Sequence, residues 1–379
     1  MLRLELPRYK KIESISKTTP DSISFSQGTI RVGGTPKPIK DFIAQLLMGD
    51  TVDYYQDGFG LASLREKIAS DLSRKHKISL ERENILVTHG ALGSITNICL
   101  TLLKEGEEVI IPVPNYPSYR NIVHFSKAKP NFVHAFVEQD GQWILDVEKI
   151  HQAITAKTKM VMLSNPSNPC GVCLPKATVL ALKDLCESYG IYLLLDEVYD
   201  NYIYETEFFS GTSLTQSSPF VIRTGSFSKD FSMSGWRVGF TVASADLISQ
   251  FGAVQDGAIC CPSVISQHAA LFALEHPELI QPQVHAVQES LQIACELLTP
   301  LVDKGLFSYI KPQAGIFLFI KTREEDCELL IMDILDKAKV ALVPGKDFGG
   351  RADSFRLCFA RNPELLRTGM RRLQNYFIK

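Results

Sequence analysis

Short, continuous apolar runs alternate along most of the chain with stretches of helical periodicity. Apolar residues at helical spacing occur at residues 60–76, 91–103, 147–154 and 178–189. Seven apolar runs between residues 85 and 242 predict strands at 85–87, 109–112, 132–136, 160–163, 192–195, 221–224 and 238–242. Continuous apolar strands separated by helices predict an α/β fold, in which a mainly parallel seven-stranded sheet lies between helices.

The pattern changes after Pro277. A long helical stretch to about residue 304 precedes short apolar runs at 307–310, 315–321, 341–343 and 354–359. Further helices are predicted at 325–338 and from Pro363 onward. Helices grouped against a few strands predict a smaller α+β domain over residues 281–379. With 379 residues, the chain is long enough for two domains.

The overall composition gives no electrostatic reason to expect nucleic acid or an anionic membrane as a partner. Lys and Arg number 40, Asp and Glu number 42, and the net charge is −2. The first residues lack the apolar core of a signal peptide. No apolar run approaches the roughly 18–20 residues that span a bilayer. We therefore expect a cytoplasmic protein.

Nine cysteines are scattered along the chain. Cys170 and Cys173 form a C-x-x-C pair, which in other sequences binds zinc or carries out redox chemistry. No second pair with ligand spacing follows, so we expect no metal site. The neighbouring Cys260 and Cys261 are expected to pack as small apolar residues.

Residues 226–239, with the sequence SFSKDFSMSGWRVG, contain the most informative motif of the chain. Lys229 follows a serine-rich turn, and Arg237 comes eight residues later. A lysine amine can bond to an aldehyde cofactor, while hydroxyls and an arginine hold the phosphate of that cofactor. A Ser-x-Ser-Lys turn alone is more often a surface loop. The complete segment resembles the lysine motif of the fold-type I class I/II aminotransferases, which depend on pyridoxal 5′-phosphate (PLP).

Further segments match the same family in the same order along nearly the whole chain. They are THGAL at 88–92, NPSNPCG at 165–171, IYLLLDEVY at 191–199 and FRLCF at 355–359. In the family these segments hold the phosphate, the pyridine hydroxyl, the pyridine nitrogen and the substrate carboxylate. The resemblance also implies that residues 1–40 join residues 281–379 in a discontinuous small domain, while residues 41–280 form the large PLP-binding domain.

The resemblance implies a role for each residue around the cofactor ring. Lys229 bonds to the cofactor and moves the Cα proton of the substrate. To act at neutral pH, the pKa of Lys229 must be lowered by burial and by the nearby cation Arg237. Asp196 pairs with the pyridine nitrogen, Asn168 and Tyr199 reach the phenolic oxygen, and Tyr116 stacks on the ring. Glu197 points to the other side of its strand and is expected to be structural.

The remaining implied contacts concern the phosphate and the substrate. The phosphate is bound by the N–H groups of Ala91 and Leu92 with Ser226, Ser228 and Arg237, together with Tyr55 of a neighbouring subunit. This last contact implies a homodimer with shared sites. Arg356 binds the substrate α-carboxylate, assisted by Asn168 and the backbone of Gly28.

Two departures from the family pattern leave the identity of the amino donor open. Gly28 is followed by Thr29-Ile30-Arg31-Val32 instead of the common acidic-Pro-Asp-Phe run. Leu92 stands where prokaryotic aspartate-type members often carry lysine. Both departures weaken the interpretation as an enzyme dedicated to dicarboxylates.

The leading hypothesis is an L-amino acid:2-oxo acid aminotransferase of amino-acid metabolism that works by a ping-pong cycle through pyridoxamine phosphate. A PLP lyase, such as a β-eliminating C–S lyase, would use the same cofactor residues. A non-catalytic PLP-binding sensor is a third alternative. Such regulators carry an N-terminal helix-turn-helix domain, whereas only about forty residues precede the predicted sheet region here.

Overall fold

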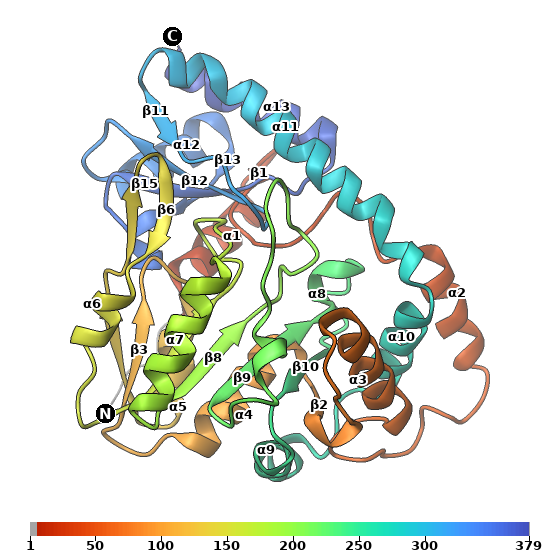
Figure 1. The fold of residues 1–379 in the computed structure, drawn as a ribbon. Coiled ribbons are helices and arrows are strands. Elements are labelled where there is room, and N and C mark those ends of the chain that lie inside the picture. Colours follow the sequence, from red (N-terminus) through yellow and green to blue (C-terminus); the bar gives the residue numbers. More distant parts are fainter. Residues whose placement is uncertain (1–5, 379) are drawn as a thin grey trace.

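A seven-stranded sheet forms the centre of the computed structural model, which describes residues 6–378 (Figure 1). The strand order is β2-β10-β9-β8-β7-β3-β4. β10 is antiparallel to β2 and β9, and the other neighbours are parallel. The predicted mainly parallel sheet is therefore confirmed. Its strands are β2 (Ile85–Thr88), β3 (Glu108–Pro112), β4 (Lys129–Val133), β7 (Thr158–Ser164), β8 (Tyr192–Asp196), β9 (Val221–Ser226) and β10 (Gly239–Val242).

Both faces of this sheet are buried, which explains why its strands are continuous apolar runs. Successive strand residues point to opposite faces. In β3, Val109 and Ile111 pack beside α4 (Gly90–Leu102), α5 (Ser118–Phe125) and α9 (Ala245–Ile259). Ile110 packs on the other face beside α6 (Val147–Gln152) and α7 (Lys176–Ser188). Near β2 and β10 the sheet is covered by α2 (Lys37–Leu46), α3 (Ala62–His76) and α10 (Val264–Glu275).

The C-terminal part of the chain forms a second layer around an antiparallel sheet of order β11-β12-β15-β14. Its strands are β11 (Phe307–Tyr309), β12 (Phe317–Thr322), β15 (Ser354–Cys358) and β14 (Val343–Pro344). Figure 1 shows α11 (Gln281–Asp303) running along one side of the molecule with α13 (Pro363–Phe377) beside it. α12 (Cys327–Ala338) packs on α13. Short 3₁₀ helices lie at Arg82–Asn84, Gly211–Leu214, Pro277–Ile280 and Gly345–Phe348.

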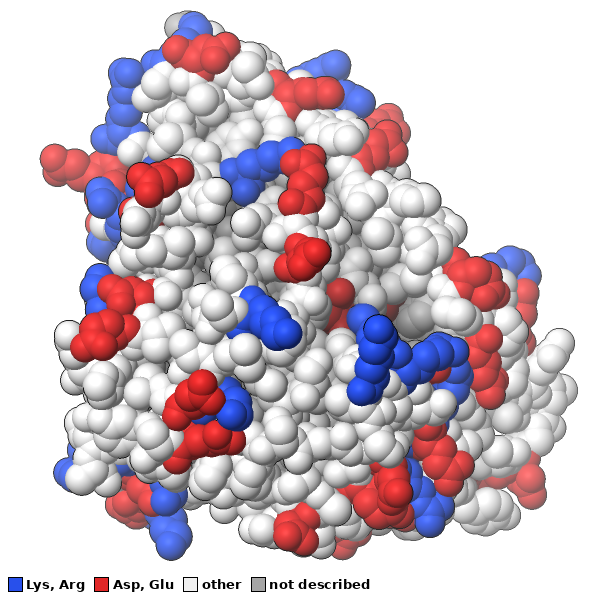
Figure 2. Space-filling view, in the orientation of Figure 1, with Lys and Arg blue, Asp and Glu red and all other residues white. Residues whose placement is uncertain are grey.

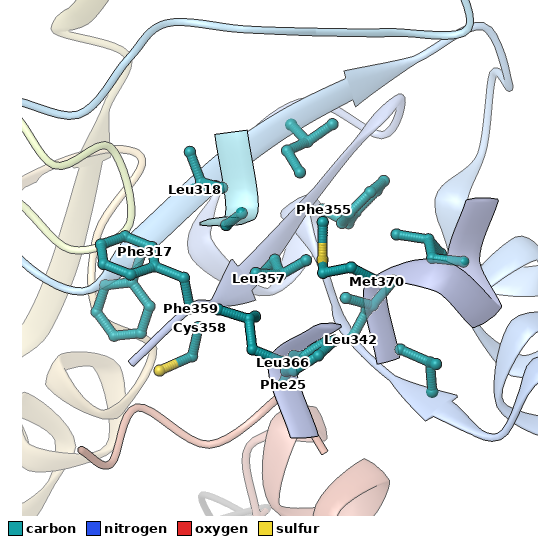
Figure 3. Packing of buried hydrophobic residues seen from close by; sticks show 14 of the residues in the cluster. Phe25, Phe317, Leu318, Leu342, Phe355, Leu357, Cys358, Phe359, Leu366 and Met370 are labelled. Carbon is teal, nitrogen blue, oxygen red and sulfur yellow. The ribbon is translucent and has the colours of Figure 1, made fainter. Parts of the chain in front are cut away.

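The N-terminal segment packs against this second layer. It contains α1 (Arg8–Thr18) and β1 (Ile23–Ser24), and β1 pairs in parallel with β13 (Val340–Ala341). Figure 3 shows Phe25 close to Leu366 and Met370 in the cluster that also contains Phe317 and Phe355. Burying an aromatic side chain contributes about 1.5–3 kcal/mol, so this cluster ties the segment around Phe25 to α13 and to the C-terminal sheet. The predicted boundaries at residues 41–280 for the large domain stay a prediction.

The structure corrects two details of the predicted strands. The strand predicted at 132–136 lies earlier, as β4, and Phe136 instead opens the hairpin β5 (Phe136–Gln139) and β6 (Gln142–Leu145). The hairpin turns at Asp140 and Gly141, whose φ angles are 50° and 72°. An Asp-Gly pair suits such a two-residue turn. The run predicted at 341–343 is divided around Leu342 into β13 and β14, which belong to different sheets.

The charge of the surface, the length of the helices and the positions of possible metal ligands relate to the partners considered from the sequence. On the face in Figure 2, acidic and basic side chains are interspersed among wide uncharged areas. Within residues 6–378, no helix is both long and apolar enough to cross a membrane. In the same range, no three His, Cys, Asp or Glu side chains gather in a metal-binding arrangement.

Candidate active site

A cavity of about 420 Å³ lies where the parallel strands of the central sheet end. Ser164 ends β7, Asp196 ends β8 and Ser226 ends β9, and all three residues line the cavity. Ser164 and Asp196 are direct register partners on neighbouring strands. Ligands of open α/β sheets bind outside the carboxyl ends of the strands, so the cavity has the location expected of a binding site.

The cavity brings together almost all residues that the sequence singled out, from segments far apart in the chain. The residues that line it are Gly28, Ala91, Leu92, Tyr116, Asn168, Asp196, Tyr199, Ser226, Ser228, Lys229, Arg237 and Arg356. Tyr55 does not line it and lies on the surface, where 84% of the residue is exposed.

Lys229 is held in the cavity by its own short helix and by contacts to its backbone. α8 (Phe227–Asp230) begins at Ser226, whose Oγ accepts a hydrogen bond from the N–H of Ser228 at 3.1 Å. The hydroxyl of Tyr202 donates to the carbonyl oxygen of Lys229 at 2.8 Å. The Nζ of Lys229 donates to the carbonyl oxygen of Gly28. Tyr202 thus holds the backbone of Lys229 in place, while the amine of Lys229 lies in the cavity next to Gly28.

The electrostatic environment of Lys229 favours a neutral amine. Burial of the ammonium group lowers the pKa of Lys229 to about 8, and the positive charges of Arg356 and Arg237 act in the same direction. Asp196 opposes this change because its negative charge stabilises the ammonium form. A pKa near 8 leaves a useful fraction of neutral amine at neutral pH.

Asp196 is a buried carboxyl group with one oxygen unpaired. Its Oδ2 accepts a hydrogen bond from the hydroxyl of Tyr119 at 2.7 Å. Its Oδ1 is buried without a hydrogen-bond partner among residues 6–378. Burial raises the pKa of Asp196 to about 6, although the hydrogen bond from Tyr119 and the charge of Lys229 lower it. A cationic donor at Oδ1 would offset the cost of this burial.

One end of the cavity gathers several hydrogen-bond donors. Ala91 and Leu92 lie in the first turn of α4, where backbone N–H groups have no partner within the helix. The hydroxyls of Ser226 and Ser228 lie 2.9 Å apart. The guanidinium of Arg237 donates to the carbonyl oxygens of Ser234 at 2.9 Å and His89 at 3.3 Å. This combination suits a phosphate group.

The approach of Arg237 to α4 explains the glycine at residue 90. The backbone of Gly90 has a φ of 68°, in the left-handed region. A Cβ atom there would lie 2.7 Å from the Nη2 atom of Arg237. A side chain at residue 90 would therefore push the guanidinium away from the helix start.

Arg356 is a buried guanidinium without a carboxylate partner among residues 6–378. It lies on β15 of the C-terminal sheet, and only 2% of the residue is exposed. Its Nη1 donates to Oδ1 of Asn168 at 3.0 Å, and its Nη2 donates to the carbonyl oxygen of Ser26. Its Nε has no hydrogen-bond partner in the described part of the chain. The guanidinium carbon is 4.1 Å from the ring centroid of Phe317.

Glu197 faces away from the cavity and belongs to a buried ionic network. Its Oε2 lies 3.1 Å from Nε of Arg223, and its Oε1 accepts from the N–H of Gly211 at 2.6 Å. Arg223 also pairs with Asp200 at 3.0 Å. Because Glu197 follows β8 directly, these contacts anchor the end of that strand, and the role of Glu197 is structural.

Sequence reasoning missed several residues that line the cavity. Tyr119 comes three positions after Tyr116, and that spacing could have indicated a second tyrosine near the site. Gln27 and Thr29 flank the predicted Gly28. Tyr9 and Lys10 come from α1, a polar segment with no recognisable motif. Their place in the cavity follows from the packing of the N-terminal segment and could not have been found by local pattern.

Comparison with known proteins identifies the family. A profile described as "Aminotransferase class I and II" matches residues 20–373. The chain is 30% identical over 369 residues to the aspartate aminotransferase of Thermotoga maritima, covering 97% of this chain and 94% of that protein. It is 27% identical to the (5-formylfuran-3-yl)methyl phosphate transaminase of Methanocaldococcus jannaschii, over 91% of this chain and 89% of that protein.

Solved structures agree with the sequence relatives. The structure of aspartate aminotransferase from Thermus thermophilus with maleate has a TM-score of 0.90 and 26% identity, and the match covers 99% of this chain and 100% of that chain. Aspartate aminotransferase from Thermotoga maritima gives 0.89 at 29% identity, with 98% and 96% covered. The chain therefore belongs to the class I and II aminotransferase family, and it is an aminotransferase with the aspartate aminotransferase fold.

Proposed function

We propose that the chain is a PLP-dependent L-amino acid:2-oxo acid aminotransferase whose site is formed by the cavity residues described above. The observation that carries the proposal is the presence of two buried, incompletely paired charged groups in one cavity. Asp196 has an unpaired oxygen, and Arg356 has an unpaired Nε and no carboxylate partner within residues 6–378. Such groups are costly unless a ligand completes their interactions.

The residues present fit PLP. The unpaired Oδ1 of Asp196 would accept a hydrogen bond from a protonated ring nitrogen. The first turn of α4, with Ser226, Ser228 and Arg237, would hold the phosphate. Tyr116 would lie against the ring, and Asn168 and Tyr199 would reach its phenolic oxygen. When bound, the cofactor supplies an aldehyde for the amino group and a ring that accepts the electron pair left on the substrate Cα.

Lys229 supplies the proton transfers. Because its pKa is about 8, its Nζ can be neutral at physiological pH and accept the proton of the substrate Cα. Its contact with the carbonyl oxygen of Gly28 keeps Nζ beside the segment that would lie over the substrate. The hydrogen bond from the Tyr202 hydroxyl to the carbonyl oxygen of Lys229 holds α8 in place. The side chain of Lys229 can then transfer the proton without a movement of its backbone.

Arg356 orients the substrate through its α-carboxylate. A guanidinium offers two parallel N–H groups to a carboxylate, and each such charge-assisted hydrogen bond is worth about 1.5–3 kcal/mol. Asn168 contacts the same guanidinium and so links the substrate end of the site to the loop after β7. Phe317 and Phe348 pack on the guanidinium and limit the access of water.

Relatives support an amino acid and a 2-oxo acid as the substrates. Several curated relatives are aspartate aminotransferases, whereas one at 27% identity is a transaminase of a furan phosphate. Substrates therefore differ among proteins that are similarly distant from this chain. We propose amino acids and 2-oxo acids as the substrate classes. The cavity residues that contact the side chain of the amino acid would determine which donor is accepted.

We also propose a homodimer in which Tyr55 reaches the phosphate of the partner's cofactor. The segment between α2 and α3 exposes several large apolar side chains, including Met48 at 88%, Tyr54 at 66% and Tyr55 at 84%. Contiguous exposed apolar residues mark interaction surfaces. A second copy of the chain would cover these side chains. In such a dimer, Tyr55 of one subunit would reach the cavity of the other subunit, because it does not line the cavity of its own.

The first prediction tests amino-group transfer in a single half-reaction. The PLP-loaded protein, incubated with single amino acids without an acceptor, should release one equivalent of 2-oxo acid per site and lose its cofactor absorbance. Lys229→Ala should bind PLP but release no 2-oxo acid, because the variant lacks the amine that accepts the Cα proton. Release of ammonia under continued turnover would identify a lyase instead, and no reaction with any common amino acid would reject the proposal.

The second prediction concerns the α-carboxylate. Arg356→Lys keeps the charge but loses the planar fork, so kcat/KM for both amino donor and 2-oxo acid should fall about tenfold to a few hundredfold. Cofactor absorbance should stay as in the wild type. The amines that correspond to the decarboxylated amino acids serve as the control. They have no α-carboxylate, so their reaction should not depend on the guanidinium of Arg356. Equal losses for amino acids and for their amines would contradict the proposed contact.

The third prediction tests the shared site by mixing subunits. Tyr55→Asp and Lys229→Ala homodimers should each be nearly inactive, because one carries a carboxylate against the phosphate and the other lacks the amine. Exchange of subunits should restore activity, since the hybrid contains one site with both native residues. Tyr54→Phe is a control for the exposed segment and should bind PLP as the wild type does. A monomer in light scattering that is fully active would rule out the shared site.

A further inference from the structure

The backbone of Lys229 is held by a residue that the proposed function does not use. Gln283 is the third residue of α11, and its Nε2 donates to the carbonyl oxygen of Lys229 at 2.5 Å. The same nitrogen donates to the carbonyl oxygen of Asp230 at 3.0 Å. α8 ends at Asp230, and the last carbonyl oxygens of a helix have no α-helical partner. Gln283 therefore supplies hydrogen bonds at the end of α8 that the helix itself cannot make.

The other contacts of Gln283 fix the orientation of its amide group. Its Oε1 accepts a hydrogen bond from the hydroxyl of Ser232, whose φ of 52° lies in the left-handed region. Its Nε2 also lies 2.5 Å from the hydroxyl oxygen of Tyr202, which itself donates to the carbonyl oxygen of Lys229 at 2.8 Å. Because carbonyl oxygens only accept hydrogen bonds, the amide nitrogen must face Lys229. A carboxylate of the same shape would place an oxygen against these acceptors.

Both side chains that donate to the carbonyl oxygen of Lys229 are anchored in the hydrophobic cluster of the C-terminal layer. Tyr202 is 0% exposed and packs in this cluster. α11 buries Val287 and Leu291 in the same cluster, one and two turns after Gln283. A side chain on a packed helix is held more precisely than one on a loop. The position of Lys229, which follows a strand of the central sheet, thus depends on the C-terminal layer as well.

We propose that Gln283 is a positioning residue, whose amide group holds the end of α8 so that the amine of Lys229 stays in place for proton transfer. Ser232 lies between Lys229 and Arg237, so the same amide group also restrains the turn that leads to the phosphate contact. The inference rests on the proposed function, in which Lys229 moves the Cα proton. A displacement of about 1 Å can lower the rate of a reaction about a hundredfold.

The first test measures the titration of Lys229 in the cofactor-free protein, so that it does not depend on turnover. Competitive labelling of amines, followed by peptide mass spectrometry, gives the pKa of a single lysine. Burial lowers the pKa of Lys229 to about 8. In Gln283→Leu the end of α8 is less restrained and the amine gains contact with water, so this pKa should rise toward the ordinary value of lysine. A loss of global stability alone would lower Tm without changing the pKa.

The second test measures the half-reaction with a single amino acid. In Gln283→Leu the rate should fall about ten- to hundredfold, while the dissociation constant of the amino acid should change less than about twofold. Arg356 still binds the α-carboxylate in this variant. With a Cα-deuterated amino acid, the isotope effect should be at least as large as in the wild type, because proton transfer is the step that slows. A smaller isotope effect, or a loss confined to amino-acid binding, would contradict the proposal.

Two further variants are the controls. Gln283→Glu has the same shape and can accept from Ser232, but its carboxylate cannot donate to the carbonyl oxygen of Lys229. This variant should lose at least as much rate as Gln283→Leu. Gln281 begins the same helix and is exposed, and its side chain makes no hydrogen bond within residues 6–378. Gln281→Leu should therefore behave as the wild type. Equal effects of Gln281→Leu and Gln283→Leu would overturn the inference, as would a wild-type rate in Gln283→Glu.

The two measurements separate this inference from the proposed function. If the wild type transfers no amino group but the pKa of Lys229 rises in Gln283→Leu, the proposed function fails and the positioning role stands. If the wild type transfers amino groups and Gln283→Leu changes neither the rate nor the pKa, the role of Gln283 alone is wrong.

Discussion

Two buried charged groups, the carboxylate of Asp196 and the guanidinium of Arg356, set the requirement on which the rest of the site depends. A charged group taken out of water is expensive unless hydrogen bonds and opposite charges surround it. Each group is partly satisfied, Asp196 by Tyr119 and Arg356 by Asn168 and Ser26. Each also has an atom without a partner in the described chain. The fold thus maintains two incomplete ionic contacts, which a protonated ring nitrogen and a substrate carboxylate would complete.

The two groups are brought together by different parts of the fold. Asp196 ends a strand of the central sheet, whereas Arg356 lies in the C-terminal sheet. The N-terminal segment joins them. Arg361 donates from three nitrogens to the carbonyl oxygens of Ser24, Thr29 and Gln27, and so fixes the backbone on both sides of Gly28. Because the carbonyl oxygen of Gly28 accepts from Lys229, the same segment contacts both layers.

Much of this could be predicted from the sequence, because the central strands are buried on both faces. Their apolar runs are continuous, and the polar residues that interrupt them, such as Asp196, fall at strand ends where a site forms. The hairpin of β5 and β6 was missed, although the Asp140-Gly141 pair between its two strands is a local signal for a two-residue turn.

Contacts between distant segments could not be predicted from local pattern. Tyr9 and Lys10 reach the cavity only because Phe25 and Arg8 dock the N-terminal segment on the C-terminal layer. Tyr55 matches a family position, yet its place in one chain is on the surface. Its proposed role depends on a second copy of the chain, which no local pattern in one sequence describes.

The unpaired oxygen of Asp196 can be tested by following the proton on the ring nitrogen of the cofactor. The protein would be loaded with PLP labelled with ¹⁵N in the ring, and the ¹⁵N chemical shift would be measured in the wild type and in Asp196→Asn. A carboxylate at Oδ1 stabilises the protonated nitrogen, whereas a neutral amide does not. The account predicts the shift of a protonated ring nitrogen in the wild type and of an unprotonated one in the variant. The same shift in both proteins would contradict it.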